Sequence, residues 1–333
     1  MRKPNVAVIG ATGMVGAQFV KILEERKFPV ENIYFFASAR SAGAKIQFNG
    51  EEHVVEELNE LNFDRPIDIG LFSAGGTISA KWAPVLAGRG GVAIDNSSHF
   101  RMKPDVPLVV PEVNADEIAC HKGIIANPNC STIQCVVPLA PLHRRFGIKR
   151  VIYSTYQAVS GSGMGGWQDL EGGLADKGYA PQKYPFKIAN NVIPQVDVFL
   201  ENGYTAEEMK MVNETRKILR VPDLHVTATC VRVPVYNGHS CSINVEFENI
   251  FDIDEVVDVL RNAPGVVVEN DSGSSIAPYP MPLTVDGSDN VHVGRIRRDL
   301  SANAVNMWVV ADNVRKGAAT NGVQIAEHIL KTL

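Results

Sequence analysis

One cysteine stands where a polar turn meets an apolar run in the stretch IIANPNCSTIQCVVPL, residues 124–139. Cys130 follows a turn at 127–129 and precedes a segment that is compatible with a helix until Pro138 and Pro141 disturb it. The positive end of a helix dipole favours a thiolate and lowers a thiol pKa from about 8.5. Free backbone N–H groups at such a position can also hold a developing oxyanion. Cys130 is therefore a candidate nucleophile, and a buried thiol that only fills space is the alternative.

A thiolate nucleophile needs a group that moves protons, and the segment CVRVPVYNGHSCSINVEF offers His239. An Asn-Gly turn signal at 237–238 precedes this histidine. On one straight strand Arg232 and His239 would face opposite ways, because they are seven residues apart. Pro234 and the turn allow both side chains to reach one site. A buried Arg232 needs a partner, which is either a substrate carboxylate or a structural acid.

A glycine-rich turn in VAVIGATGMVGAQFV lies between a predicted strand and a predicted helix. Gly10, Gly13 and Gly16 have the spacing G-x-x-G-x-x-G, which differs from the usual G-x-G-x-x-G. Such a turn presents backbone N–H groups and a helix dipole to a phosphate. Glycines required only for packing are the alternative. The place of the turn in the first strand-helix unit favours dinucleotide binding.

The end of the second predicted strand indicates which dinucleotide binds. An NAD site carries a carboxylate there, which binds the ribose 2′-hydroxyl. Here the strand NIYFFAS ends in Ser38, followed by Ala39, Arg40 and Ser41. A guanidinium flanked by hydroxyls suits a 2′-phosphate, because arginine binds phosphate bidentately. The sequence therefore predicts NADP, and an arginine on a solvated loop is the alternative.

Two kinds of elements must position these residues. Short apolar runs alternate with helical patterns over the first ~125 residues, which is typical of a parallel sheet. The expected strands are 5–10, 32–38, 67–73, 91–97 and 108–113, with a helix over 13–28. Longer strand-like runs follow at 149–160, 225–249 and 303–313, with a helix over 205–219. This second pattern favours a mixed or antiparallel sheet with helices on one face.

Two helices receive specific predictions. Thr205 and Glu208 have the spacing of a capping box at the start of the 205–219 helix. The tail, 314–333, has an amphipathic pattern. We expect the tail helix to pack on the first domain, which makes that domain discontinuous.

Composition narrows the class of protein. The chain has 333 residues, of which 45% are hydrophobic and 21% charged, and this is typical of a globular protein with two domains. The net charge of −5 argues against nucleic-acid binding. No apolar run approaches the ~20 residues of a membrane span, and the apolar N-terminal run is too short for a signal peptide. We therefore expect a cytoplasmic protein.

Cysteine and histidine spacing argues against a metal site. The five cysteines are odd in number and include no C-x-x-C pair, so we expect reduced thiols and no structural zinc. His239 with Cys241 alone is a weak metal signal. We therefore predict no metal.

Taken together, the motifs resemble the aspartate-β-semialdehyde dehydrogenase family over nearly the whole chain. The matching stretches are GATGMVG, ASARSAG, SSHFRM, NPNCSTIQ, TYQAVSGSG, NVIPQVD, EEMKMVNETRKIL, CVRVPVYNGHS, VGRIRRD and DNVRKGAATNGVQIAE. The resemblance implies NADP-dependent reductive dephosphorylation of L-4-aspartyl phosphate to L-aspartate 4-semialdehyde through a cysteine thioester. This reversible step leads toward lysine, threonine and methionine.

The resemblance also implies an α/β fold with two domains. A Rossmann-type NADP-binding domain is expected at 1–129 with 313–333, and an α+β catalytic and dimerisation domain with a mixed sheet at 130–312. The expected assembly is a homodimer, or in some relatives a tetramer, with the second domain forming the interface. The implied ligands are the small-molecule substrate, inorganic phosphate and NADP.

The family's residue roles transfer to matching positions. The implied catalytic residues are Cys130 as nucleophile, His239 as acid/base and Gln157 as the group that orients substrate. Arg232 matches the arginine that binds the substrate α-carboxylate, and Glu207 is a contact for the substrate amino group. The implied phosphate-binding residues are Arg101, Asn129 and Lys210. The implied cofactor contacts are Gly10, Thr12, Gly13, Met14, Val15, Gly16, Ser38, Arg40, Ser41, Ser73, Gly75, Asn96, Gly161 and Asn313.

Two other functions are compatible with parts of this sequence. N-acetyl-γ-glutamyl-phosphate reductase uses the same acyl-phosphate chemistry on a longer, acetylated substrate, but the helix EEMKMVNETRKIL favours the aspartyl enzyme. A non-catalytic NADP-binding sensor belongs to another class. The presence of a nucleophile, a base and an anion-binding arginine together argues against a sensor.

Overall fold

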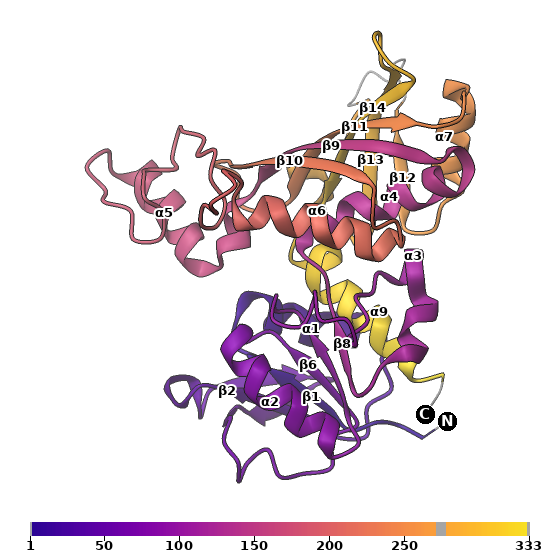
Figure 1. Cartoon of the computed structure of the whole chain (residues 1–333). Helices are drawn as coiled ribbons and strands as arrows, with labels where there is room; N and C mark the ends of the chain where they lie inside the picture. Colours follow the sequence, from indigo (N-terminus) through magenta and orange to yellow (C-terminus); the bar gives the residue numbers. More distant parts are fainter. Residues whose placement is uncertain (1, 271–277, 332–333) are drawn as a thin grey trace. The chain divides into compact units, whose positions relative to one another are not determined.

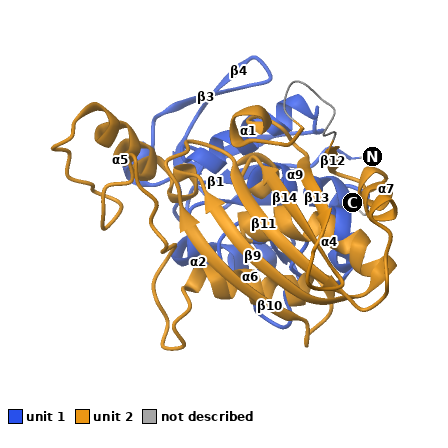
Figure 2. Cartoon of the chain, turned by 90° about the horizontal axis from the view of Figure 1, so that it is seen from above, with its two compact units in different colours: residues 1–128, 318–333 blue, residues 129–317 orange. Residues whose placement is uncertain are grey.

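The computed structural model describes residues 2–270 and 278–331, which fold into two compact units (Figures 1 and 2). The first unit is formed by residues 1–128 and 318–333, and the second by residues 129–317. The last two residues of the predicted tail helix, 332–333, lie outside the described residues. Among the described helices, none combines the length and the hydropathy that a bilayer span requires.

Within the described residues, the first unit contains a parallel sheet with strands in the order β5-β2-β1-β6-β7-β8. Its strands are β1 (Val6–Ile9), β2 (Ile33–Ala37), β5 (Glu56–Glu57), β6 (Ile69–Phe72), β7 (Val92–Asp95) and β8 (Ile124–Ala126). Its helices are α1 (Met14–Glu25), η1 (Ala39–Ser41), α2 (Gly76–Gly88), α3 (Pro111–Asn114), η2 (Ala115–Cys120) and α9 (Thr320–Ile329). A small hairpin of β3 (Lys45–Phe48) and β4 (Glu51–Val54), which no pattern predicted, completes the unit.

The strands of the first unit are apolar throughout because helices cover both faces of the sheet. Val6 and Val8 of β1 share one core with α1 and the tail helix α9. On the other face, Phe36 packs on Phe63, which packs on Trp82 of α2. The tail helix α9 contacts α1 and belongs to this compact unit.

The strand predicted at 108–113 is wrong. Leu108 forms a single bridge with Ala126, and Pro111 then opens the short helix α3. The side chain of Asn114 explains the difference, since its Oδ1 accepts from the N–H of Val110 and its Nδ2 donates to the carbonyl of Leu108. These backbone groups are therefore satisfied locally and need no further strand partner.

The second unit contains a mixed sheet, ordered β10-β9-β11-β14-β13-β12 in the described residues. The strands are β9 (Ile148–Gln157), β10 (His225–Arg232), β11 (His239–Phe247), β12 (Val266–Glu269), β13 (Val291–Arg298) and β14 (Ala304–Ala311). The helices are α4 (Cys130–Phe146), η3 (Val159–Ser162), α5 (Met164–Ala175), α6 (Ala206–Leu219), α7 (Ile253–Arg261), α8 (Pro282–Val285) and the π-helical turn η4 (Arg315–Ala319). The pairs β9–β10 and β12–β13 are parallel and the others are antiparallel, so the predicted mixed sheet is confirmed.

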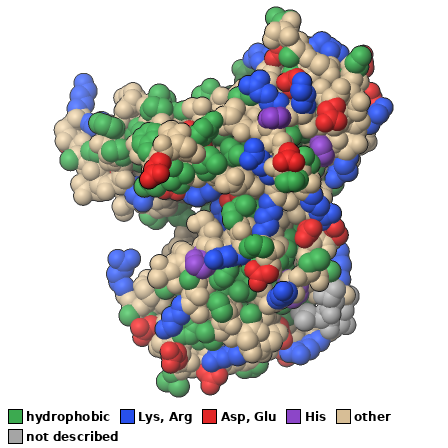
Figure 3. Space-filling view, viewed as in Figure 1, with side chains coloured by type: hydrophobic (Ala, Val, Ile, Leu, Met, Phe, Trp, Pro, Cys, Tyr) green, Lys and Arg blue, Asp and Glu red, His purple; other side chains and the backbone are tan. Residues whose placement is uncertain are grey.

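Helices α4 and α6 lie on one face of this sheet and contact each other, while its other face is turned toward the viewer in Figure 2. The capping box at the start of α6 is confirmed: the N–H of Glu208 donates to the Thr205 hydroxyl, and the Thr205 N–H donates to the Glu208 carboxylate. Figure 3 shows basic and acidic side chains interspersed over the face in view.

Helix α4 runs farther than the sequence indicated. It continues through Pro138 and Pro141 to Phe146 and ends at Gly147, whose φ is 67°. Each proline removes an intrahelical hydrogen bond. Most of the helix is buried, and hydrophobic packing outweighs that local cost.

Candidate functional site

Cys130 is the first residue of α4, as predicted. Its neighbour Asn129 is the N-cap, and the side-chain Oδ1 of Asn129 accepts from the N–H groups of Ser131 and Thr132 at 3.0 and 3.2 Å. Cys130 is partly exposed, whereas Cys135 is fully buried. Burial raises the pKa of the Cys135 thiol well above its ordinary value. Cys130 therefore has the position that suits a thiolate, and Cys135 does not.

The first-turn N–H groups differ from the sequence prediction. We expected free donors that would hold an oxyanion, but Ser131 and Thr132 donate to the Asn129 side chain. The N–H of Ile133 donates to the Asn129 carbonyl at 2.9 Å. The capping asparagine explains the difference, because an N-cap side chain satisfies these same donors.

Glu207 joins several predicted residues into one hydrogen-bonded set, which we call the Asn129 network. Its carboxylate, on α6 and 6% exposed, accepts from Asn129 Nδ2 at 2.9 Å and from Gln157 Nε2 at 3.2 Å. The same Gln157 Nε2 donates to the Ser131 hydroxyl at 2.6 Å. Lys210 Nζ lies 3.2 Å from the other oxygen of Glu207. Gln157 and Glu207 are thus held directly beside the turn that carries the thiol.

Lys210 is bound by two carboxylates. Its ammonium lies 2.7 Å from Asp197 and 3.2 Å from Glu207. Burial alone would lower the pKa of Lys210, but the charges of Glu207 and Asp197 outweigh it and raise that pKa. Lys210 is therefore a fixed positive charge at the edge of the Asn129 network.

Arg232 and His239 meet at one residue, Ala158, in what we call the Ala158 network. Arg232 Nη1 donates to the Ala158 carbonyl at 2.6 Å, and the Ala158 N–H donates to His239 Nδ1 at 3.0 Å. Strand β10 ends at Arg232 and β11 begins at His239, so the intervening turn lets both side chains reach this residue. Because Gln157 precedes Ala158 in the chain, the two networks are adjacent.

His239 is fully buried and neutral. Burial and then the charge of Arg232 lower the pKa of His239 well below its ordinary value. Since Nδ1 accepts from a backbone N–H, the proton of the neutral ring is on Nε2. Among the described residues, Nε2 has no hydrogen-bond partner. The imidazole is therefore arranged to donate a hydrogen bond from Nε2 to a bound molecule.

Gly161 and Asn313 surround the Ala158 network. A Cβ at Gly161 would lie 2.9 Å from Arg232 Nη1 and 3.0 Å from His239 Nε2, so a larger residue there would displace one of these side chains. The Asn313 side chain bonds the Ser160 hydroxyl and accepts from the N–H of Gly238 at 3.0 Å. Both residues were predicted as cofactor contacts, and in the second unit both support the segment that carries Ala158.

Asp169 and Tyr184, which lie near Arg232, were not predicted from the sequence. The carboxylate of Asp169, 1% exposed, accepts from the backbone N–H groups of residues 182–184 and from the Tyr179 hydroxyl. These bonds lower the pKa of Asp169 despite its burial. They fix Tyr184, whose ring centroid lies 6.0 Å from the guanidinium carbon of Arg232.

The predicted cofactor residues of the first unit follow the carboxyl ends of its parallel strands. The glycine turn follows β1, which lies between β2 and β6 at the point where the strand order reverses. Gly10 has φ 86°, and a Cβ at Gly16 would lie 2.1 Å from the Gly10 carbonyl oxygen. Thr12 is exposed and the first turn of α1 has no side-chain cap. This is the geometry in which such turns bind a dinucleotide phosphate.

The remaining residues of the first unit lie along the same edge. Ser38 and Arg40 are exposed directly after β2, and no carboxylate stands between β2 and η1. The Ser73 hydroxyl binds the carbonyl of Ile9, and Gly75 is the N-cap of α2. The other predicted residues of the unit are Gly13, Met14 and Val15 in the turn, Ser41 in η1, and Asn96 after β7.

Arg101 belongs to the first unit. It is 7% exposed and donates from Nε to the Asn127 carbonyl at 3.0 Å and from Nη2 to the Asn96 carbonyl at 2.9 Å. The other two predicted phosphate-binding residues, Asn129 and Lys210, belong to the second unit.

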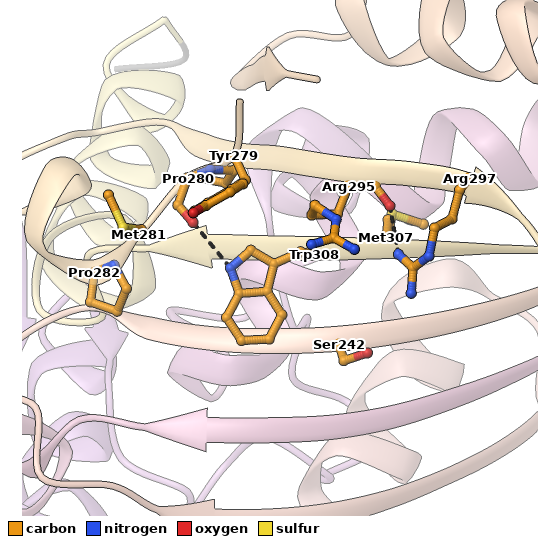
Figure 4. A pocket seen from close by; sticks show the side chains of 9 residues that line it. All are labelled: Ser242, Tyr279, Pro280, Met281, Pro282, Arg295, Arg297, Met307 and Trp308. Carbon is orange, nitrogen blue, oxygen red and sulfur yellow. Dashed lines mark hydrogen bonds between the residues drawn. The ribbon is translucent and has the colours of Figure 1, made fainter. Parts of the chain in front are cut away.

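A separate pocket lies on the sheet of the second unit, and none of its nine lining residues is a predicted site residue (Figure 4). Ser242 and Trp308 face each other across β11 and β14 in its floor. The Trp308 indole N–H donates to the Pro280 carbonyl at 3.0 Å, and Arg295 and Arg297 complete one side.

Besides Asp169 and Tyr184, three groups that bind predicted residues were not predicted from the sequence. The Ser131 hydroxyl, the backbone of Ala158 and the carboxylate of Glu214 each bind a predicted residue. Ser131 directly follows the cysteine, and Glu214 stands seven residues after Glu207, which is two helical turns. That spacing could have indicated Glu214, whereas no sequence pattern indicates that the backbone of Ala158 binds a site residue.

The chain is similar to known proteins over its whole length. Residues 5–121 match the family described as semialdehyde dehydrogenase, NAD binding domain, and residues 139–316 match semialdehyde dehydrogenase, dimerisation domain. The chain is 53% identical to the aspartate-semialdehyde dehydrogenase of Aquifex aeolicus, with 98% of each chain covered.

Two solved structures are also similar. The aspartate semialdehyde dehydrogenase II of Vibrio cholerae complexed with ASA matches with a TM-score of 0.95 and 47% identity over 99% of each chain. The aspartate semialdehyde dehydrogenase with NADP from Candida albicans matches with a TM-score of 0.77 and 27% identity over 99% of each chain.

Proposed function

This chain belongs to the aspartate-semialdehyde dehydrogenases, and from that premise we propose that it interconverts L-4-aspartyl phosphate and NADPH with L-aspartate 4-semialdehyde, phosphate and NADP⁺. The reaction places the protein in the biosynthesis of lysine, threonine and methionine. We propose that it acts in the cytoplasm as a homodimer, and that the second unit supplies the interface. The family description of residues 139–316 as a dimerisation domain supports this assembly.

Cys130 is the proposed nucleophile. In the biosynthetic direction its thiolate attacks the acyl carbon, a C–S bond forms, and the C–O bond to phosphate breaks. The product is a thioester, whose carbonyl stays electrophilic because sulfur conjugates poorly with it. The position of Cys130 at the start of α4 supports the thiolate form.

The cofactor is proposed to be NADP, which supplies or accepts the hydride when bound. The glycine turn at the start of α1 would hold its pyrophosphate; Gly16 lets this turn close, because a Cβ there would clash with the Gly10 carbonyl oxygen. Arg40 with Ser38 and Ser41 would bind the 2′-phosphate. We assign these roles to residues 1–129 with 313–333, and catalysis to residues 130–312.

Fixed charges would orient the substrate. The Arg232 guanidinium, already bonded to Ala158, would bind the α-carboxylate, and Glu207 would receive the amino group. Lys210, held as a positive charge by Asp197 and Glu207, would bind the phosphate. Gln157 is held by Glu207 and Ser131 beside the thiol, where its amide would steady the reacting acyl group.

His239 would serve the tetrahedral states formed on Cys130. Because its proton is on Nε2, it would donate a hydrogen bond to the oxyanion and then to the departing sulfur. His239 would thus stabilise the oxyanion in place of the first-turn N–H groups of α4, which donate to the Asn129 side chain.

The observation that carries this proposal is the convergence of Asn129, Gln157 and Glu207 on the turn of Cys130. A direct test is an assay of NADPH absorbance with L-aspartate 4-semialdehyde, NADP⁺ and phosphate. We expect sustained NADPH formation only when phosphate is present; without phosphate, formation should stop after about one NADPH per Cys130, when the thiol is acylated. Equal rates without phosphate, or no rate with it, would contradict the function; N-acetylglutamate semialdehyde in the same assay tests the related reductase.

A further inference from the structure

Helix α6 holds the residue before the nucleophile with two buried carboxylates. Glu207 accepts from Asn129 Nδ2 at 2.9 Å, and Glu214 accepts from the Asn129 backbone N–H at 2.7 Å. The two glutamates are seven residues apart, so they lie nearly two full turns along one face of the helix. One rigid helix therefore binds both the side chain and the backbone of the same asparagine.

The hydrogen bonds of Asn129 leave it little freedom to move. Its carbonyl and Oδ1 accept from the first turn of α4, while its N–H and Nδ2 donate to α6. Cys130 is the next residue along the chain. The orientation of the Cys130 Cα–Cβ bond consequently depends on where α6 places Asn129.

Burial of the Glu214 carboxylate costs free energy. It is 1% exposed, and burying a charge is unfavourable unless strong hydrogen bonds compensate it. The 2.7 Å bond to Asn129 has the length of a charge-assisted hydrogen bond. This bond holds the backbone N–H of the N-cap residue in one position.

We propose that Glu214 is a positioning residue for the Cys130 thiol. Through Glu214, helix α6 sets the distance between the nucleophile and the substrate-binding residues Glu207 and Lys210, which the same helix carries. This inference rests on the proposed function, because Cys130, Glu207 and Lys210 have their roles from it. Glu214 itself touches neither the substrate nor the cofactor.

The test compares Glu214→Ala with Glu208→Ala in a Cys120→Ser background, since Cys120 is an exposed thiol. Glu208 is a matched control: it lies on the same helix, is 8% exposed, and accepts from the N–H groups of Thr205 and Cys230 rather than from Asn129. Iodoacetamide titration of Cys130, followed by mass spectrometry, gives the fraction of intact sites, so that kcat is expressed per active thiol.

We expect Glu214→Ala to lower kcat per thiol by about 10- to 100-fold, with the KM for semialdehyde changed by less than about twofold. It should also slow Cys130 alkylation and shift its pH profile. Glu214→Gln keeps an acceptor oxygen and should recover most of the rate. Glu208→Ala should lose similar thermal stability but keep the wild-type kcat per thiol and alkylation profile.

Two outcomes would overturn the inference. One is a Glu214→Ala variant with wild-type kcat per thiol and alkylation. The other is an equal loss in Glu214→Ala and Glu208→Ala, which would indicate general destabilisation. Failure of the proposed function is distinguishable, because the wild type would then form no NADPH while the alkylation profiles would still compare the two glutamates.

Discussion

Arg232 and His239 bind opposite sides of one peptide residue: Arg232 donates to the carbonyl of Ala158, and His239 accepts from the N–H of Ala158. The two side chains come from different strands, β10 and β11. Their relative position is therefore fixed by a backbone segment that neither strand contains. This arrangement lowers the pKa of His239 through burial and the charge of Arg232, and it fixes the ring proton on Nε2.

The first prediction concerns the shape of the Arg232 side chain. Arg232→Lys keeps the positive charge but removes the planar group that can bind Ala158 and a carboxylate together. We expect the KM for semialdehyde to rise about 10- to 100-fold, which corresponds to ~1.5–3 kcal/mol for a lost charge-assisted bond. Steady-state kinetics measures this, and an unchanged KM would count against carboxylate binding by Arg232.

The second prediction concerns the space at Gly161. Gly161→Ala places a methyl group 2.9 Å from Arg232 Nη1 and 3.0 Å from His239 Nε2, so one of these groups must move. We expect kcat/KM to fall by about 10- to 100-fold in a folded protein.

Gly165→Ala is the control for this substitution. The atoms nearest to its methyl group would belong to the Lys183 side chain, at 3.5 Å, which is ordinary van der Waals contact. Wild-type activity in both variants would show that the Arg232 and His239 positions do not matter for catalysis.

The third prediction concerns stability and pH. His239 is neutral when folded and has a lowered pKa, whereas in the unfolded chain it titrates near ~6.5. Below that pH the unfolded chain binds a proton that the folded chain does not. The free energy of unfolding should therefore fall as the pH drops, by up to ~1.4 kcal/mol per pH unit from this group.

Urea denaturation of wild type and His239→Gln, between about pH 7.5 and about pH 5.5, measures this contribution. The variant should lose less stability over the interval than the wild type. His225→Gln, at an exposed position on β10, is the control and should follow the wild type. A wild type and a His239→Gln variant with parallel pH profiles would show that the histidine is not held neutral.

The fourth prediction concerns the choice of cofactor. Arg40→Ala removes the proposed partner of the 2′-phosphate, and we expect the KM for NADP⁺ to rise about 10- to 100-fold while that for NAD⁺ changes little. Arg26→Ala is the control, because Arg26 binds Glu327 on the same unit. An unchanged preference for NADP⁺ in Arg40→Ala would assign the 2′-phosphate to other residues.

Local patterns predicted most of the fold. The glycine turn after β1, the capping box of α6 and the amphipathic tail helix all follow from residues close together in the chain, and the structure confirms them as elements. The parallel and mixed sheets follow from strand length and from the alternation with helices.

Where the sequence prediction of the fold was wrong, tertiary contacts explain the difference. Pro138 and Pro141 do not end α4, because the helix is buried and its packing outweighs two missing hydrogen bonds. The apolar run before Pro111 is not a strand, because Asn114 satisfies its backbone groups.

The site was predictable where chemistry selects the residue type. Cys130 and His239 stand out because each follows a turn, and Arg232 stands out because it is a charged residue between apolar neighbours. Ala158 could not be predicted in this way, because it binds His239 through its backbone N–H, a group that almost every residue type has. The occupied N–H groups of the first turn of α4 depend on the rotamer of Asn129, which the sequence does not specify.

Detection of an acyl-enzyme on Cys130 is the most direct test of the proposed mechanism. The protein is incubated with L-aspartate 4-semialdehyde and NADP⁺ in the absence of phosphate, digested at low pH, and analysed by mass spectrometry. We predict an aspartyl group on the Cys130 peptide, absent in Cys130→Ala and released when phosphate is added. Turnover without this adduct, or an adduct on another cysteine, would contradict the account.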